Sequence, residues 1–86
     1  MLATPTIHLN GTSAKELFEG YLAAYRAIGA AIDAVQKACP NGRDYYPQGN
    51  EAIQQALAEH RARLEKLIEV RREIETIAQI IQDQQP

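Results

Sequence analysis

The sequence has little of what small proteins use to reinforce a single core. It contains no tryptophan and only one cysteine, Cys39, among 86 residues. A single cysteine excludes an internal disulfide and a zinc site built on paired cysteines. A chain this short buries only about 60% of the surface that its unfolded form exposes. Self-association is the remaining way to add buried surface, so we expect a homodimer or a higher oligomer.

Long apolar runs and an excess of positive charge are also missing. No apolar run approaches the roughly 20 residues that span a bilayer, and the N-terminus lacks the basic and apolar regions of a secretory signal. Nine basic and eleven acidic residues give a formal net charge of −2. Wrapping duplex DNA requires a clustered positive surface. We therefore expect a cytoplasmic domain with neither a membrane nor duplex DNA as its partner.

Proline, glycine and capping residues divide the chain, which we interpret as one domain over residues 1–86. Ser13 and Glu16 have the spacing of a capping box, and Cys39 is pushed out of helical geometry because Pro40 follows it. Asn50 is suited to cap a second helix. The expected segments are an extended N-terminal segment at 1–12, a helix at 13–39, a loop at 40–49 and a helix at 50–84.

Both helices carry apolar residues at steps of three and four, the heptad pattern of helices that pack along a seam. The steps alternate throughout the first helix, and in the second they resume after one additional three-residue step from Leu67 to Val70. The seam consists of Phe18, Tyr21, Tyr25, Ile28, Ile32, Val35 and Cys39 in the first helix, and of Ile53, Leu57, His60, Leu64, Leu67, Val70, Ile74, Ile77 and Ile81 in the second. The pattern predicts an all-α, coiled-coil-like antiparallel two-helix hairpin. We expect the last turns of the longer second helix to overhang and to be covered by Ile7 and Leu9.

Small residues fill a further face of the first helix. On a helical wheel Lys15, Glu19, Arg26, Asp33 and Lys37 fall within a strip about 40° wide. Large apolar residues occupy the arc on one side of this strip, and small residues occupy the arc on the other side. These small residues are Gly20, Ala23, Ala24, Ala27, Ala30, Ala31, Ala34 and Ala38. One interpretation is that exposed alanines merely favour a helix. We favour close packing against another copy, which gives a homo-oligomeric helical bundle.

The loop concentrates polar and aromatic side chains, more than a minimal helical connection needs. The candidate binding residues are Arg43, Asp44, Tyr45, Tyr46, Gln48 and Asn50. A guanidinium and aromatic rings are groups that grip phosphate and stack on a base. In the alternative the loop is structural, with both tyrosines capping the hairpin core and Arg43 paired with Asp44.

A second polar cluster, consisting of His8, Asn10, Thr12 and Ser13, precedes the first helix. It lies beside the free amides of a helix start, which favour anions. In one hairpin this cluster and the loop lie at opposite ends. Two hairpins packed antiparallel would bring the loop of one copy to the N-terminal cluster of the other, giving two equivalent shared sites.

We expect no catalytic residues, no metal site and no cofactor, because a two-helix hairpin offers no pocket in which acids, bases or nucleophiles converge. Cys39 and His60 are expected to be core residues, with His60 fixing register by a hydrogen bond across an interface. The second helix carries mixed-sign pairs typical of a solvated face. These pairs are Glu59 with Arg63, Arg61 with Glu65, and Arg71 with Glu75.

Two blocks of the sequence, I-H-L-N-G-T-S at 7–13 and P-N-G-R-D-Y-Y-P-Q-G at 40–49, resemble blocks in small accessory proteins of tailed phages and prophages. The order of blocks and helices is similar over most of the chain. The resemblance implies the host cytoplasm as the setting. Small accessory proteins there commonly block host defences by binding a host protein or sequestering a nucleotide signal.

These observations predict a non-enzymatic, phage-type accessory protein. It would bind, and in the stronger form of the hypothesis sequester, an anionic nucleotide-like ligand at sites shared between subunits. In the alternative hypothesis the chain is a protein-interaction factor, either a host-defence inhibitor or a phage assembly or regulatory adaptor. That factor would dock on a host or phage protein through residues 40–50 and the charged face of the second helix.

Overall fold

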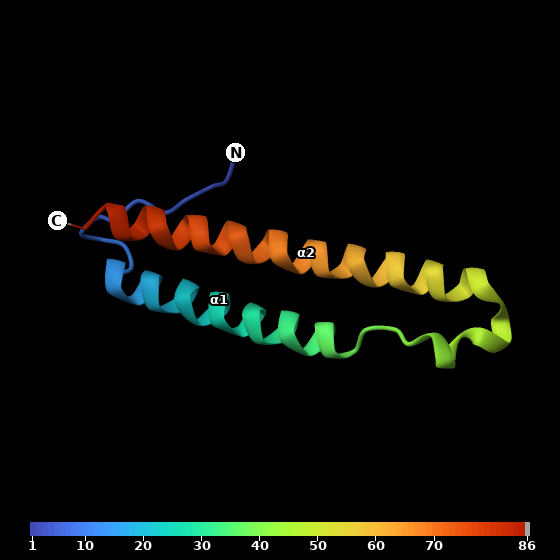
Figure 1. Ribbon diagram of the computed structural model, residues 1–86. Helices are drawn as coiled ribbons and strands as arrows, with labels where there is room; N and C mark the ends of the chain where they lie inside the picture. The colour runs from blue at the N-terminus through green and yellow to red at the C-terminus, as the bar shows by residue number, and fades with distance from the viewer. Residues whose placement is uncertain (86) are drawn as a thin grey trace.

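A computed structural model describes residues 1–85, which form two long α-helices packed against each other as a hairpin (Figure 1). Helix α1 covers Ala14–Lys37 and helix α2 covers Asn50–Asp83. Two short 3-10 helices, η1 (Gly42–Asp44) and η2 (Tyr46–Gln48), lie in the loop between them. No strand occurs among these residues, so the predicted all-helical hairpin is confirmed. Pro86, the last residue of the predicted domain, lies outside the described residues.

Helix α1 begins at its predicted cap but ends before Cys39. The Ser13 hydroxyl oxygen accepts a hydrogen bond from the backbone amide of Glu16 at 3.1 Å, which is one half of the predicted capping box. The Glu16 carboxylate returns no hydrogen bond to any residue of 1–85. Ala38 is the C-cap, and Cys39 is exposed. Cys39 therefore ends neither the helix nor the apolar seam, contrary to the prediction.

Helix α2 begins at Asn50, but Gly49 rather than the predicted Asn50 occupies the N-cap position. Gly49 has a φ of 100°, a conformation that glycine adopts without the steric cost of a side chain. With 34 residues against 24, α2 overhangs α1. The overhang lies at the first turns of α2, where the loop runs beside it, and not at the last turns as predicted (Figure 1).

Few side chains in the hairpin are fully enclosed. Ile81 is 0% exposed, and Ile32, Ala56, Ala78 and His60 are each 8% or 9% exposed. The N-terminal segment reaches α2 through Gln84, whose side-chain oxygen accepts from the amide of Ile7 at 2.8 Å and whose side-chain nitrogen donates to the carbonyl of Pro5 at 2.9 Å. Ile7 is half-buried there. Leu9 is 102% exposed and covers nothing, contrary to the prediction.

An arginine packs across the middle of the helix pair. The Arg71 guanidinium carbon lies 3.9 Å from the centroid of the Tyr25 ring, and Arg71 Nε donates a hydrogen bond to the Tyr25 carbonyl at 3.1 Å. Gly29 is buried, and a Cβ at this position would meet the guanidinium. Arg71 therefore contacts the other helix and does not form the predicted solvent-exposed ion pair with Glu75.

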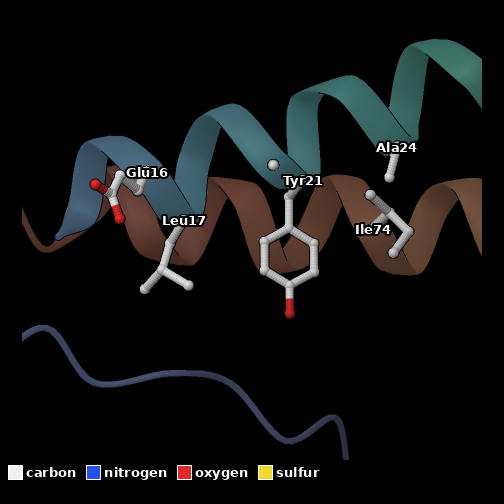
Figure 2. Close-up of a pocket in the computed structure, with 6 residues that line it drawn as sticks. Glu16, Leu17, Tyr21, Ala24 and Ile74 are labelled. Carbon is white, nitrogen blue, oxygen red and sulfur yellow. The ribbon is translucent and has the colours of Figure 1, made fainter. Parts of the chain in front are cut away.

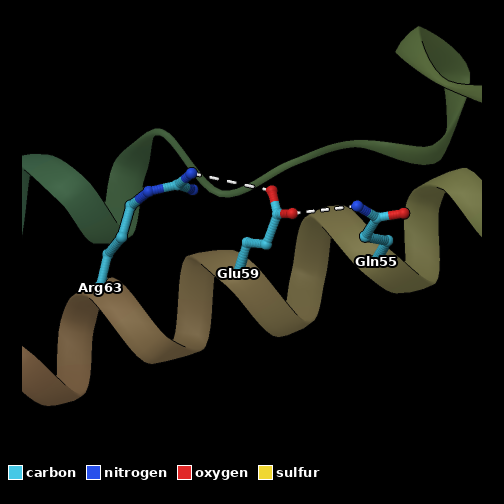
Figure 3. A network of polar contacts seen from close by, with 3 residues as sticks. All are labelled: Gln55, Glu59 and Arg63. Carbon is cyan, nitrogen blue, oxygen red and sulfur yellow. Dashed lines mark hydrogen bonds and ion pairs between the residues drawn. The ribbon is translucent and has the colours of Figure 1, made fainter.

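A single ion pair forms within the described residues, between Arg63 and Glu59 at 3.7 Å (Figure 3). The predicted pairing of Arg61 with Glu65 is absent from this set. The described residues measure 62 × 23 × 18 Å along their principal axes. None of their helices is both long enough and apolar enough to cross a membrane.

Candidate functional site

The backbone of the loop is held by consecutive tight turns. The Asn41 side-chain oxygen accepts from the amide of Arg43 at 3.0 Å, and the amides of Asp44 and Tyr45 donate to the carbonyls of Asn41 and Gly42, both at 3.0 Å. The amide of Gln48 donates to the carbonyl of Tyr45 at 2.9 Å. These bonds satisfy much of the loop backbone without using the candidate binding side chains.

Most of the candidate side chains on this loop are exposed. Tyr46 is 75% exposed, and Tyr45 is half-buried. The other exposed candidates are Arg43, Asp44, Gln48 and Asn50. Within residues 1–85 the Arg43 guanidinium forms no ion pair with Asp44. The alternative in which the loop is structural therefore holds for Tyr45, which turns inward. It does not hold for Tyr46, which is exposed, or for the ion pair of Arg43 with Asp44, which does not form.

A shallow hollow of about 180 Å³ lies between the loop and the first turns of α2. Tyr45 and Gln48 line it from the loop, and Gln55 and Glu59 line it from α2. The Glu59 carboxylate accepts a hydrogen bond from Gln55 at 3.1 Å and contacts Arg63 at its other oxygen (Figure 3). Because a carboxylate repels an anion, the outer side of the loop is better suited to a phosphate than this hollow.

The N-terminal cluster is exposed at the other end of the hairpin. His8, Asn10, Thr12 and Ser13 are all exposed, and Ser13 is already engaged as the cap of α1. A turn closes between His8 and Gly11, whose amide donates to the His8 carbonyl at 3.2 Å. A Cβ on Gly11 would lie 2.8 Å from the His8 ring, so the glycine allows the imidazole to fold against the turn.

The structure places the two predicted clusters at opposite ends of the rod (Figure 1). A single chain therefore keeps the two clusters apart, in agreement with the prediction that they lie at opposite ends of one hairpin. No group of three or more metal-ligating side chains gathers anywhere in residues 1–85. Each cluster alone offers polar groups on an open surface, which suits reversible binding of an anion or of a protein surface.

Two features that sequence reasoning missed lie along the helices. The first is the contact of Arg71 with Tyr25, for which buried Gly29 within a helix was the available signal. The second is the extent of an apolar groove of about 290 Å³ beside α1, in which Leu17, Tyr21 and Ile74 join Gly20 and Ala24 of the small-residue face (Figure 2). Comparison of the chain with protein-family models, with curated proteins and with solved structures finds no match.

Proposed function

We propose that this protein is a non-enzymatic binding protein for an anionic, nucleotide-like ligand. The observations that support this most directly are an exposed Tyr46 and an exposed Arg43 that forms no ion pair with Asp44, both on a loop whose backbone is held by turns. A planar guanidinium can form two parallel hydrogen bonds to a phosphate. A tyrosine ring offers a face on which a base stacks.

In this proposal the binding site is shared between two copies of the chain. Arg43 contacts phosphate, Tyr46 stacks on a base, and Gln48 and Asn50 read its edge. Tyr45, half-buried beside α2, supports the loop. The exposed segment from His8 to Thr12 of a second copy closes the site, with Ser13 holding the start of α1 beside it. Such sharing lets a small chain without a deep pocket enclose a ligand.

The biological role in this proposal follows from the phage resemblance of the two sequence blocks. A protein that binds a nucleotide signal in the host cytoplasm lowers the free concentration of that signal. Sequestration requires no catalysis, only affinity and sufficient copies of the protein. We propose this activity as a block on a host-defence signal.

The second candidate is a protein-interaction factor. It is favoured by the charged face of α2, where the residues that carry charge are exposed and few are engaged with each other. The exposed charged residues of α2 outside the Glu59–Arg63 ion pair include Arg61, Glu65, Lys66, Glu69, Arg72, Glu73 and Glu75. Such a face, together with residues 40–50, could dock on a host or phage protein through complementary charge.

Calorimetric titration of the purified chain with nucleoside monophosphates, linear dinucleotides and cyclic dinucleotides tests the first candidate. We expect one class to bind and to raise the melting temperature, since a ligand bound only by the folded form stabilises it. Arg43→Ala and Tyr46→Ala should each weaken binding by about 10- to 100-fold, at the scale of one lost charged or stacking contact.

Arg61→Ala is the matched control, because it removes another exposed arginine, on α2 and away from the loop. It should leave ligand affinity unchanged. A panel in which no nucleotide binds would contradict the proposal and favour the protein-interaction candidate. Equal losses in Arg43→Ala and Arg61→Ala would reveal nonspecific charge attraction instead of a site.

A further inference from the structure

The hairpin exposes more surface than a self-sufficient protein of its mass. A monomeric globular protein of 9.6 kDa exposes about 5,100 Å², whereas this chain exposes 6607 Å², an excess of roughly 1,500 Å². Its radius of gyration is 18.7 Å, against about 12 Å for a compact domain of this length. Two helices alone leave much of each other's apolar surface uncovered.

Part of this uncovered surface is an apolar groove. It is about 290 Å³ in volume and is lined by Leu17, Gly20, Tyr21 and Ala24 of α1 and by Ile74 of α2. Leu17 and Tyr21 point to the same side of α1, with Ile74 beside them (Figure 2). Val70, one turn before Ile74 on α2, is 45% exposed. The groove therefore continues from one helix to the other.

The groove belongs to a second heptad seam on α1. The seam that contacts α2 includes Tyr25, Gly29 and Ile32, whereas the groove lies on the adjoining flank. Steps of four and three along this flank give Leu17, Tyr21, Ala24, Ile28, Ala31 and Val35. All of these are half-buried except Ala31, which is exposed. A helix with two adjacent apolar seams is suited to pack against two neighbours.

We propose that a second copy of this chain occupies this face and that two hairpins form a four-helix bundle. The excess of roughly 1,500 Å² per chain corresponds to a total burial of about 3,000 Å², within the 2,000–5,000 Å² range of obligate homodimers. The small side chains at Gly20, Ala24 and Ala31 allow two helix backbones to approach closely. The Arg71 guanidinium, stacked on Tyr25, lies on the other seam and leaves this face apolar.

The N-terminal segment does not fill the groove, because Gln84 holds Pro5 and Ile7 at the end of α2 and Leu9 is fully exposed. No charged side chain other than Glu16 lines the groove. This inference does not rest on the proposed ligand, since two hairpins can associate with none present. Association and ligand binding are measured separately. A dimer that binds no nucleotide would leave this inference standing, whereas a monomer would overturn both this inference and the shared site of the proposed function.

Sedimentation velocity of the full chain at micromolar concentration tests the proposal, and we expect a species of twice 9.6 kDa. The decisive variant is Gly20→Glu. A Cβ at Gly20 meets nothing within 4 Å in the single chain, so the hairpin tolerates the new side chain. In the bundle it places a carboxylate in an apolar contact, which should raise the dissociation constant about 100-fold or more.

Ala58→Glu is the matched control, since it adds the same group at an exposed position of α2 away from the groove. It should leave the mass unchanged, and circular dichroism should show equal helicity in both variants. If Gly20→Glu loses helicity, Val70→Glu takes its place. A monomeric wild-type chain, association with a different protein only, or equal masses for the groove variant and its control would overturn the proposal.

Discussion

At the residue scale, one arginine joins the two helices through both its flat face and its edge. The Arg71 guanidinium stacks on Tyr25 and its Nε donates to the Tyr25 carbonyl. Gly29 leaves the room for this arrangement, since any Cβ there would meet the guanidinium. Glycine normally weakens a helix interior by about 1 kcal/mol. The contact with Arg71 is the physical reason for its presence.

Gly29→Ala should lower the free energy of unfolding by about 1–3 kcal/mol. The variant gains about 1 kcal/mol of helix propensity but displaces Arg71 from a cation–π contact and a charged hydrogen bond, together about 2–4 kcal/mol. In an Arg71→Ala background the same change should instead stabilise the helix by about 1 kcal/mol. Urea unfolding of the four proteins at one concentration measures this coupling, and additive effects would show that the contact contributes nothing.

At the element scale, heptad spacing predicted the two helices but not the division of their faces. One seam was drawn through Phe18, Tyr21, Tyr25, Ile28 and Ile32. Phe18, Tyr25 and Ile32 lie toward α2 as predicted, but buried Gly29 joins them there and Tyr21 lines the groove instead. Glycine carries no apolar side chain, so a pattern of large residues passes over it. The register of the partner helix depends on such local gaps, and the sequence shows the glycine but not which side chain of the other helix packs against it.

The sequence predicted which residues make up the candidate site, but not which of their side chains are exposed. Turn-forming residues around Arg43 and Tyr46 predicted a loop, and the structure shows why it is ordered, with the Asn41 side chain bound to the amide of Arg43. The inward turn of Tyr45 depends on the first turns of α2 beside it. His60 is 9% exposed as expected for a core histidine. Its hydrogen bond across an interface stays a prediction.

The N-terminal segment is an element positioned by a single side chain. Gln84→Ala removes the two hydrogen bonds that hold Pro5 and Ile7. Amide exchange at Ile7 should accelerate about fivefold, since an exposed hydrogen bond contributes on the order of 1 kcal/mol. Hydrogen-exchange NMR measures the change, and global stability should fall by no more than about 1 kcal/mol.

Gln82→Ala is the control for this prediction. Its side chain is exposed and makes no hydrogen bond to another residue of 1–85. Exchange at Ile7 should therefore match that of the unmodified chain. If Gln84→Ala leaves the Ile7 amide equally protected, packing of the half-buried Ile7 holds the segment, and the glutamine is incidental.

At the scale of the whole molecule, the shared site requires antiparallel hairpins. The proposed second seam runs from Leu17 to Val35, so a two-fold axis through its middle crosses α1 near Arg26. At 1.5 Å per residue, Thr12 and Cys39 lie about 20 Å from that point in opposite directions. In an antiparallel pair, Thr12 of one copy is therefore level with Cys39 of the other. In a parallel pair the two Cys39 side chains are neighbours.

Thr12→Cys in the otherwise unmodified chain distinguishes these orientations. Under mild oxidation we expect a covalent dimer, since both new sulfur pairs lie across the subunit interface, while the two ends of one α1 are about 36 Å apart and cannot react with each other. The unmodified chain should stay uncrosslinked, because its two Cys39 thiols would be about 40 Å apart. The reverse result, ready crosslinking through Cys39 alone, would show parallel hairpins, and the loop of one copy would then lie too far from the N-terminal cluster of the other to share a ligand.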